Sequence, residues 1–162
     1  MNHHHDQLGN HSDADLLARF IWTEARGERL EGKLAVAHMV LNRVKARSHY
    51  GSNISDVILK SKDFLGLRER DSMLAQMPNA VSTDREFALC KAIAELATRG
   101  HLKDDPTGGA THFHRVTQKP SWASKLIFRR QIGNHFFYRD PLMRSIEDHS
   151  LQPQALAVGR QP

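Results

Sequence analysis

One glutamate, Glu24 in the stretch Trp-Thr-Glu-Ala-Arg-Gly-Glu of residues 22–28, has the clearest potential for acid catalysis. Three apolar side chains precede it by three, four and seven residues, namely Ile21, Phe20 and Leu17. In a helix this spacing places the carboxyl group on the apolar stripe, where burial and the negative end of the helix dipole both disfavour the charged form. Glu24 is therefore predicted to keep its proton near neutral pH and to act as a general acid. The spacing leaves an alternative open, an exposed residue in the last helical turn, and Arg26 could pair with the carboxylate.

The helix expected to carry this glutamate runs from about residue 13 to residue 25, after a start signal at Ser12. A second helix with a broad apolar stripe follows it and ends near residue 45. On this second helix, His38 is expected to be a hydrogen-bonded core residue. Asn42 and Arg43 could reach the glutamate, with solvated surface as the default. Glu28 and Glu31, at its start, are expected to be solvated charges.

A third helix is predicted to begin at a capping box formed by Thr83 and Glu86 and to end at Gly100. The single cysteine, Cys90, excludes an internal disulfide, and its apolar neighbours indicate a small core residue rather than a nucleophile. A short helical segment is also expected around residues 55–59, capped by Asn53 or Ser55.

Two extended runs, residues 110–114 and 134–138, flank a linker that contains Trp122. We expect these runs to pair as a small antiparallel hairpin, which gives an α+β, mainly α fold class. Between the short helix and the third helix, residues 61–82 show no sustained period. This segment, which carries Asp63, Phe64 and Asp71, could be a functional loop at the edge of a substrate groove or poorly ordered surface.

With 162 residues and 40% hydrophobic content, the chain suits one domain with its own core. We expect this domain to span residues 13–140. A disordered or tag-like N-terminus, residues 1–12, would precede it, and a C-terminal tail, residues 141–162, would follow. We expect a monomer and no metal or other cofactor.

The formal charge of +5 and the pI near 9.7 favour contact with a polyanion. Lys and Arg are spread along the chain, and only Arg129 and Arg130 are adjacent, so nucleic acid is not expected as a partner. No apolar run approaches the ~20 residues of a membrane span, so stable membrane insertion is not expected. The polar start lacks the apolar core of a secretory signal, which indicates synthesis in the cytoplasm without a signal peptide.

Several short motifs occur in a fixed order along the chain. They are Leu-Leu-Ala-Arg at 16–19, Glu-Ala-Arg-Gly-Glu at 24–28, Glu-Gly at 31–32, Ala-Val-Ala at 35–37, Val-Leu-Asn-Arg-Val at 40–44, Asp-Pro-Thr-Gly-Gly-Ala at 105–110 and Ile-Gly-Asn-His at 132–135, with Phe137 and Tyr138. Together these motifs resemble those of the SleB-type cell wall hydrolases, which include the spore cortex-lytic enzymes. The resemblance implies a lysozyme-like, mainly helical domain that cuts the glycan strands of peptidoglycan, with Glu24 as the catalytic acid.

The resemblance also implies a set of substrate-binding residues: Glu28, Asn42, Asp105, Thr107, Gly108, Gly109, Phe113, Trp122 and Tyr138. The turn at 107–109 would present backbone and hydroxyl groups to the sugar, and the aromatic residues would stack on sugar faces. Core packing is the alternative for Phe113 and Tyr138. The chain departs from the family at residues 112–115, where His-Phe-His-Arg replaces a tyrosine-rich segment ending in asparagine, and at residues 62–73.

The similarity of the family to lytic transglycosylases implies that one acid can suffice. Glu24 would protonate the oxygen between N-acetylmuramic acid and N-acetylglucosamine, and the sugar's own 6-hydroxyl would close a 1,6-anhydro ring. The alternative is hydrolysis, which normally needs a second carboxylate at about 5 to 9.5 Å. The candidates for that second group are Glu28, Asp63, Asp71 and Asp105.

Two rival functions remain open from the sequence. A metal-dependent wall amidase or peptidase could use His112 and His114 on one side of a strand, with His135 on the neighbouring run as a third ligand. A non-catalytic module that binds a polyanion would explain the charge alone. For the wall-degrading enzyme, we expect action on the cell wall in the periplasm or outside, after release of the protein through a holin in a phage or prophage setting.

Overall fold

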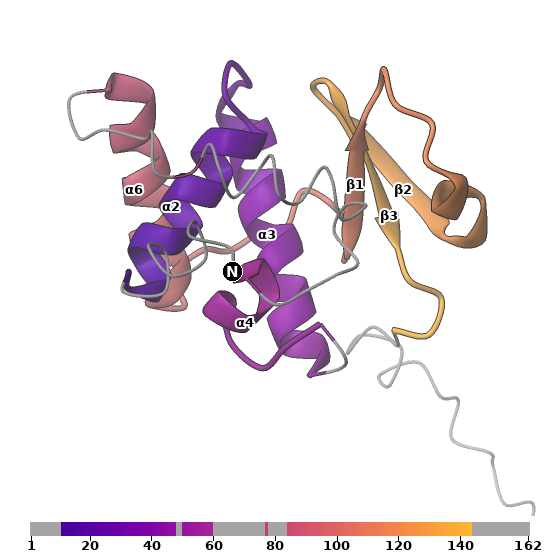
Figure 1. Cartoon of the computed structure of the whole chain (residues 1–162), viewed down its shortest axis with the longest axis horizontal. Coiled ribbons are helices and arrows are strands. Elements are labelled where there is room, and N and C mark those ends of the chain that lie inside the picture. The colour runs from indigo at the N-terminus through magenta and orange to yellow at the C-terminus, as the bar shows by residue number, and fades with distance from the viewer. Residues whose placement is uncertain (1–10, 48–49, 60–76, 78–83, 144–162) are drawn as a thin grey trace, which may run out of the picture.

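The computed structural model describes residues 11–47, 50–59, 77 and 84–143. Figure 1 shows its elements in chain order: α2 (Asp13–Glu24), α3 (Leu30–Ala46), α4 (Ile54–Leu59), α6 (Arg85–Thr98), β1 (His112–Arg115), the 3-10 helix η2 (Ser121–Lys125), β2 (Ile127–Ile132) and β3 (His135–Arg139). The fold is α+β and mainly α, as predicted. Apart from Met77, the expected loop at 61–82 lies outside the described residues, as do most of both termini.

Helix α2 begins and ends close to the predicted residues. The Ser12 side chain caps its start by accepting a hydrogen bond from the Asp15 backbone N–H at 3.2 Å. The apolar stripe is fully buried and consists of Leu16, Leu17, Phe20 and Ile21. This burial confirms the helical period read from the sequence and fixes the face on which the last residue, Glu24, must lie.

The cap of α6 differs from the prediction. Asp84, not Thr83, is the N-cap, and its Oδ1 accepts hydrogen bonds from the backbone N–H groups of Glu86 and Phe87 at 2.8 and 3.3 Å. One carboxylate oxygen therefore accepts from two of the backbone N–H groups that have no partner within the first turn. In a capping box the Glu86 side chain would fold back to the N-cap residue. Here it contacts Lys33 and Gly27 instead.

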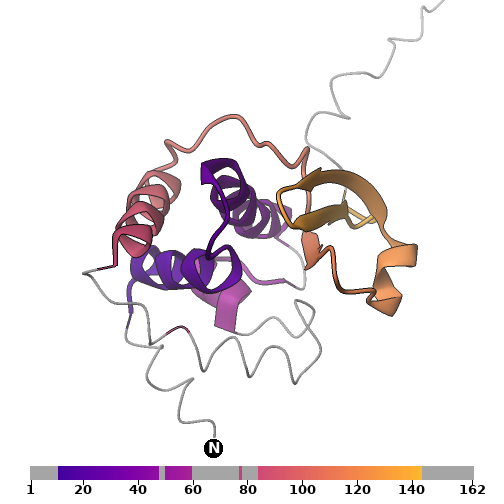
Figure 2. The same ribbon diagram turned by 90° about the horizontal axis from the view of Figure 1, so that it is seen from above.

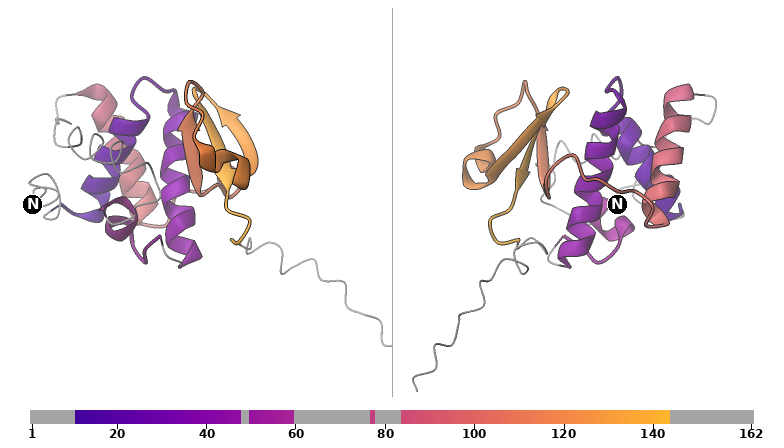
Figure 3. Two further views of the ribbon diagram at one scale, coloured as in Figure 1. Left: turned by 45° about the vertical axis from the view of Figure 1, so that its right-hand side comes forward. Right: turned by 180° about the vertical axis from the view of Figure 1, so that it is seen from behind.

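The core lies between α2, α3, α4 and α6 and continues to the inner face of the sheet. Helix α3 stands between the other helices and the sheet (Figures 1 and 2), and Figure 3 shows from two further sides that the sheet lies on the α3 side, away from α6. Cys90 is buried in this core, and burial raises the pKa of its thiol to about 12, which confirms its predicted structural role. His38 is buried as well and contacts the Lys103 carbonyl oxygen at 3.3 Å.

Arg43 was expected on solvated surface, and the structure shows that this was wrong. Its side chain is fully buried and donates from Nε to the Thr111 carbonyl oxygen at 2.5 Å. Its guanidinium also lies over the Tyr50 ring, 4.4 Å from the centroid. Arg43 thus ties α3 to the chain that enters β1, because a buried guanidinium must find acceptors.

The sheet has three antiparallel strands in the order β1-β3-β2. The predicted pairing of the two extended runs is confirmed, with Phe113 opposite Phe137 and His114 opposite Phe136. Strand β2 was missed, because it lies in the segment expected to be a linker. Its sequence, Ile-Phe-Arg-Arg-Gln-Ile, does not alternate apolar and polar residues, so a strand could not be recognised from the pattern. In the structure, all its residues except Ile132 are exposed. No helix within the described part of the chain is long and apolar enough for a membrane span.

Candidate active site

Glu24 is the last residue of α2 and is half-buried. Burial raises the pKa of its carboxyl group to about 7, and the positive charge of Arg115 at the end of β1 acts in the opposite direction. No side chain or backbone group of the described residues forms a hydrogen bond or an ion pair with this carboxyl group. Glu24 is therefore a proton donor near neutral pH whose acidic group is not committed to a structural contact.

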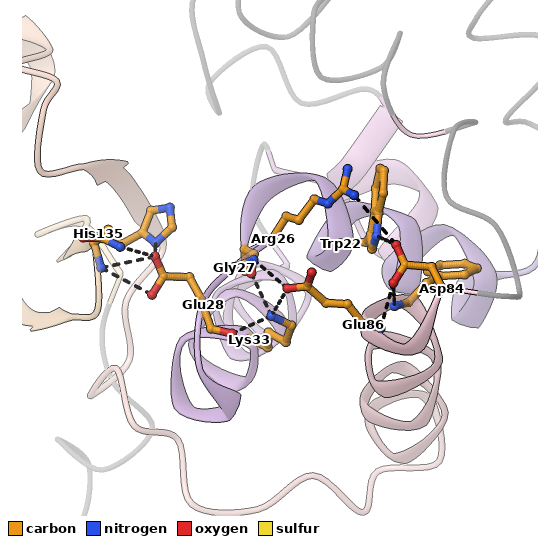
Figure 4. Close-up of polar contacts among 11 residues, drawn as sticks. Trp22, Arg26, Gly27, Glu28, Lys33, Asp84, Glu86 and His135 are labelled. Carbon is orange, nitrogen blue, oxygen red and sulfur yellow. Dashed lines mark hydrogen bonds and ion pairs between the residues drawn. The ribbon is translucent and has the colours of Figure 1, made fainter.

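Arg26, which could have neutralised this carboxyl group, is turned away from it. Its guanidinium lies over the Trp22 ring, 4.5 Å from the centroid, and its Nη2 is 4.0 Å from Asp84 Oδ2. The same Asp84 oxygen accepts a hydrogen bond from Trp22 Nε1 at 2.9 Å. These contacts hold Arg26 against the start of α6 (Figure 4), so the pairing that would have removed the acid is not formed.

Lys33 fixes the turn that follows Glu24. Its side chain is only 1% exposed, and Nζ donates to the carbonyl oxygens of Ala25 and Glu28 at 2.9 and 2.6 Å. Nζ also pairs with Glu86 Oε1 at 2.7 Å, and that oxygen accepts the Gly27 N–H at 2.5 Å. Figure 4 shows Glu86 reaching from α6 to both partners. This ion pair thus connects the turn after Glu24 to α3 and α6 and supplies a cation to the carbonyl end of α2.

The pKa of Glu86 reflects this pairing. Burial alone would raise it, but the hydrogen bond and charge of Lys33 and the N–H of Gly27 together lower it. Glu86 is therefore ionised near neutral pH, where Glu24 titrates. The turn after Glu24 is held by a charged contact over the whole range in which Glu24 itself titrates.

Glu28 is not the solvated charge that was expected. Its Oε1 accepts hydrogen bonds from the Asn134 backbone N–H at 3.3 Å and from Asn134 Nδ2 at 3.0 Å, and it lies 3.7 Å from His135 Nδ1. A Cβ atom added at Gly133 would lie 1.9 Å from Glu28 Oε2. The carboxylate therefore fastens the turn between β2 and β3 to the start of α3, and only glycine allows this approach.

The loop before β1 is organised around Asp105. Its two carboxylate oxygens accept from the Thr107 N–H and hydroxyl at 2.8 and 2.7 Å and from Gly109 N and Asn42 Nδ2, both at 2.9 Å. Burial would raise the pKa of Asp105, but these hydrogen bonds outweigh it and the pKa is lowered. Asp105 is thus an ionised structural centre for residues 105–110.

This loop places three of the other predicted sugar-binding residues. Thr107 is fully buried, and its hydroxyl also accepts the Ala110 N–H, so it does not present that hydroxyl at the surface. Gly108 and Gly109 are partly exposed and have positive φ angles of 67° and 83°. Some of their backbone groups are already used within the protein: the Gly109 N–H donates to Asp105, and the Gly108 carbonyl oxygen accepts from Arg129 Nε at 2.9 Å. The others remain accessible to a ligand.

The predicted aromatic residues fall on opposite faces of the sheet. Phe113 is buried against His135 and Phe137 on the face toward the helices, which supports the core alternative. Trp122 and Tyr138 are half-buried on the other face, with ring centroids 5.8 Å apart. Only these two remain accessible for stacking.

The three-histidine metal site required by the rival amidase or peptidase function is not formed among the described residues. His112 and His114 do share a face, since both lie beside Trp122 with centroids 5.4 and 5.6 Å away. His135 is opposite Arg115 in the register and contacts Phe113, so it points to the other face. Burial lowers the pKa of His135 to about 4. In the part of the chain that the structure describes, no group of three His, Cys, Asp or Glu side chains could hold a metal ion.

Comparison with known proteins agrees with the resemblance read from the motifs. A profile of the family described as Cell Wall Hydrolase matches residues 27–138, which begin three residues after Glu24. A spore cortex-lytic enzyme of Halalkalibacterium halodurans is 30% identical over 127 residues, which cover 78% of this chain and 34% of the relative. A spore cortex-lytic enzyme of Bacillus cereus is 31% identical over 129 residues, 78% of this chain and 44% of the relative. The chain thus spans less than half the length of these relatives.

Two solved structures share the fold. The catalytic domain of the germination-specific lytic transglycosylase SleB from Bacillus anthracis is 26% identical with a TM-score of 0.58, over 80% of this chain and 98% of that domain. The catalytic domain of the Bacillus cereus SleB protein is also 26% identical, with a TM-score of 0.57, over 78% and 89% of the two chains.

Proposed function

Because this chain belongs to the Cell Wall Hydrolase family, we propose that it degrades peptidoglycan by cutting the glycan strand between N-acetylmuramic acid and N-acetylglucosamine. The observation that carries this proposal is the state of Glu24. Its pKa of about 7 and its lack of a bonded partner among the described residues leave it protonated and free to donate. Spore cortex-lytic relatives and a lytic transglycosylase domain with the same fold support the substrate class.

The reaction would proceed in two proton transfers at one carboxyl group. Glu24 first donates its proton to the glycosidic oxygen while the bond from that oxygen to the anomeric carbon of N-acetylmuramic acid breaks. The resulting carboxylate then takes the proton of the 6-hydroxyl group of the same sugar as its oxygen bonds to the anomeric carbon. The products are a free 4-hydroxyl on N-acetylglucosamine and a 1,6-anhydromuramic end, and no water is consumed.

The engagement of the other carboxylates favours this route over hydrolysis. Glu28 is held by Asn134, and both oxygens of Asp105 accept two hydrogen bonds each from within the protein. A second carboxylate that positions water or attacks the sugar needs a free oxygen directed at the substrate. Neither of these groups offers one. The other two candidates, Asp63 and Asp71, lie outside the described residues.

The test is digestion of purified sacculi with identification of the released fragments by mass. Wild type should release fragments with 1,6-anhydro ends. Glu24→Gln should release them at least about 100-fold more slowly, because the amide cannot donate an acidic proton. Glu31→Gln, an exposed glutamate at the start of α3, is the matched control and should behave as wild type.

Each other outcome identifies a different function. Reducing ends without anhydro groups would establish hydrolysis and overturn the transglycosylase step. Release that survives Glu24→Gln but is abolished by a chelator would establish metal-dependent chemistry. Binding to sacculi with no bond cleavage by wild type would leave a non-catalytic module.

A further inference from the structure

The positive charge of this protein is concentrated in one part of the fold. Residues 106–139, which form the sheet and η2, contain six Lys and Arg residues and no Asp or Glu. The six are Arg115, Lys119, Lys125, Arg129, Arg130 and Arg139. The remainder of the chain has 17 Lys and Arg against 18 Asp and Glu, since the whole chain has 23 and 18. The net charge of +5 therefore originates in the sheet segment.

Of these six side chains, only Arg129 donates a hydrogen bond to a described residue, to the Gly108 carbonyl oxygen. Five of them are exposed, and none of the six forms an ion pair with any residue that the structure describes. The helices contrast with this, because there Arg19 and Lys33 pair with carboxylates at 2.7 Å. Unpaired like charges on one small sheet repel one another, so their presence is better explained by an external anion than by stability.

The outer face of the sheet carries a continuous set of rings beside these charges. We call it the aromatic face; it consists of His114, Trp122, Phe128, Phe136 and Tyr138. Neighbouring ring centroids in this set are 5.3 to 6.0 Å apart. Phe128 is 53% exposed, although it lies within the sheet.

The inner face of the sheet contributes Phe113 and Phe137 to the core, and the aromatic face lies on the other side of the sheet. In the strand register, Phe128 is opposite Tyr138, whereas the buried Phe137 belongs to the inner face with Phe113. Exposed Lys125 precedes Phe128 by three residues, and exposed Lys119 lies just before η2. Arg130 is exposed too, but the register shift after Phe128 places it opposite Phe137, on the inner face. Aromatic rings and Lys side chains thus occur together around η2 and β2, and the acid Glu24 is not part of this set.

We propose that the aromatic face extends sugar binding from the predicted stacking residues Trp122 and Tyr138 to Phe128, and that with the exposed Lys side chains beside it this face holds the protein on a glycan strand of the cell wall. Sugar rings pack on exposed aromatic rings, and the free carboxylates of the stem peptides complement the unpaired Lys and Arg. A single exposed phenylalanine would be ordinary surface. A contiguous aromatic set within an acid-free, basic segment calls for a ligand with both apolar faces and negative charge.

This inference rests on the proposed function for its choice of polymer. Single-stranded nucleic acid also combines stacking faces with negative charge, and it would use the same types of side chain. The relation to cortex-lytic enzymes makes the wall glycan the ligand that the protein would meet. Nucleic acid is therefore the competing ligand in the test.

The experiment measures binding of the Glu24→Gln protein to purified sacculi by co-sedimentation at low and moderate salt. Phe128→Ser removes the exposed ring, and Lys119→Gln with Lys125→Gln removes two exposed charges beside it. Each is expected to weaken binding about tenfold. Lys45→Gln with Lys91→Gln removes two exposed charges from α3 and α6 and is the matched control, with less than a twofold effect. Melting curves confirm that every variant is folded.

Charge removal should also reduce the salt dependence of binding, because fewer ionic contacts are screened. Unchanged affinity in both test variants would overturn the inference, as would tighter binding of a DNA oligonucleotide than of sacculi. Equal loss in the control double variant would show a general charge effect and would overturn it too. If wild type releases no fragments while the test variants still lose binding, the proposed cleavage fails and the binding face stands.

Discussion

The helices and the sheet of this protein use positive charge in different ways. In the helical part, cations meet carboxylates, as in the pairs Arg19 with Asp15, Arg26 with Asp84 and Lys33 with Glu86. In the sheet part, residues 106–139, there are no carboxylates, and its Lys and Arg side chains make no ion pair with the described residues. The first arrangement positions the chain around Glu24, and the second leaves charge available to a ligand.

This difference follows from burial. Lys33 is almost completely enclosed, and a buried ammonium group must be paired and hydrogen-bonded to be tolerated. The sheet cations are mostly exposed, where water solvates them and a pair would add little stability. Removing a cation should therefore damage the fold in the helical part and should damage only binding in the sheet part.

Lys33→Met is expected to have the largest effect. It leaves the Glu86 carboxylate and the carbonyl oxygens of Ala25 and Glu28 without their shared donor, which should lower the free energy of unfolding by roughly 3 kcal/mol. The released turn should also slow cleavage. Chemical denaturation and the rate of fragment release measure both. Lys45→Met, at an exposed position of the same helix, should change neither, and a stable, fully active Lys33→Met would contradict this role.

The pH dependence of cleavage should follow Glu24. Because its pKa is raised to about 7, the protonated acid is abundant below that pH, and the rate should fall about tenfold for each pH unit above it. The rate of fragment release from sacculi, measured from pH 5 to pH 9, gives the alkaline limb of this pH-rate profile. A limb near the ordinary glutamate value would show that Glu24 is not buried in the active protein.

The same pKa shift predicts a stability difference between Glu24→Gln and wild type. The folded-state pKa of this carboxyl group lies above its unfolded value of 4.5, so the native protein binds more protons between pH 4.5 and about 7. Wild type should therefore lose stability as pH rises through this window, whereas the glutamine variant should not. Melting curves at pH 4 and pH 8 should show Glu24→Gln to be more stable than wild type only at pH 8. The difference in unfolding free energy should be on the order of 1 kcal/mol.

Asn134→Ala tests the connection between the two parts of the molecule. It removes the Nδ2 hydrogen bond to Glu28 at 3.0 Å but keeps the backbone donor at 3.3 Å. The loss should be about 1 kcal/mol of unfolding free energy, because half of the contact survives. If urea denaturation shows no change, the turn between β2 and β3 does not depend on Glu28.

Arg115 is the exception among the sheet cations, because its charge acts on the helical part by lowering the pKa of Glu24. Arg115→Gln should move the alkaline limb of the pH-rate profile upward, whereas Arg115→Lys should leave it in place. The shift should be clearer at low ionic strength, because salt screens exposed charges. A downward shift would contradict the assignment.

The smallest effect on stability is expected for Lys125→Gln with Arg130→Gln. Both side chains are exposed and without ion pairs among the described residues, so their removal should leave the melting temperature unchanged or slightly higher. A drop comparable to that of Lys33→Met would remove the distinction between the two parts of the molecule.

The features predicted correctly from the sequence are those with local causes. The partial burial of Glu24 agrees with its spacing to Leu17, Phe20 and Ile21 on a single helix, although that spacing alone had left an exposed last-turn residue open. The cap at Asp84 was misplaced by one residue, because Thr83 and Asp84 are both good capping residues and only geometry decides between them.

The features that were missed have partners far away in the sequence. Lys33 meets Glu86 across 53 positions, and Glu28 meets Asn134 across 106. A lysine or glutamate at the start of a helix normally lies in solvent, so nothing nearby indicates that either is enclosed. Strand β2 was missed for a related reason, since its partner β3 and not its own pattern makes it a strand. The charge of the sheet could have been found, because a gap of 34 residues without an acid is visible in the sequence.

The absence of Asp and Glu from residues 106–139 has a consequence for how attachment and turnover depend on alkalinity. Above about pH 7 Glu24 loses its proton, whereas the binding proposed for this segment depends on aromatic rings and Lys side chains and not on Glu24. The protein should then remain bound to the wall without cleaving it. Mild acidification would restart cutting without a new search for substrate, so local pH could time the reaction on a surface already occupied.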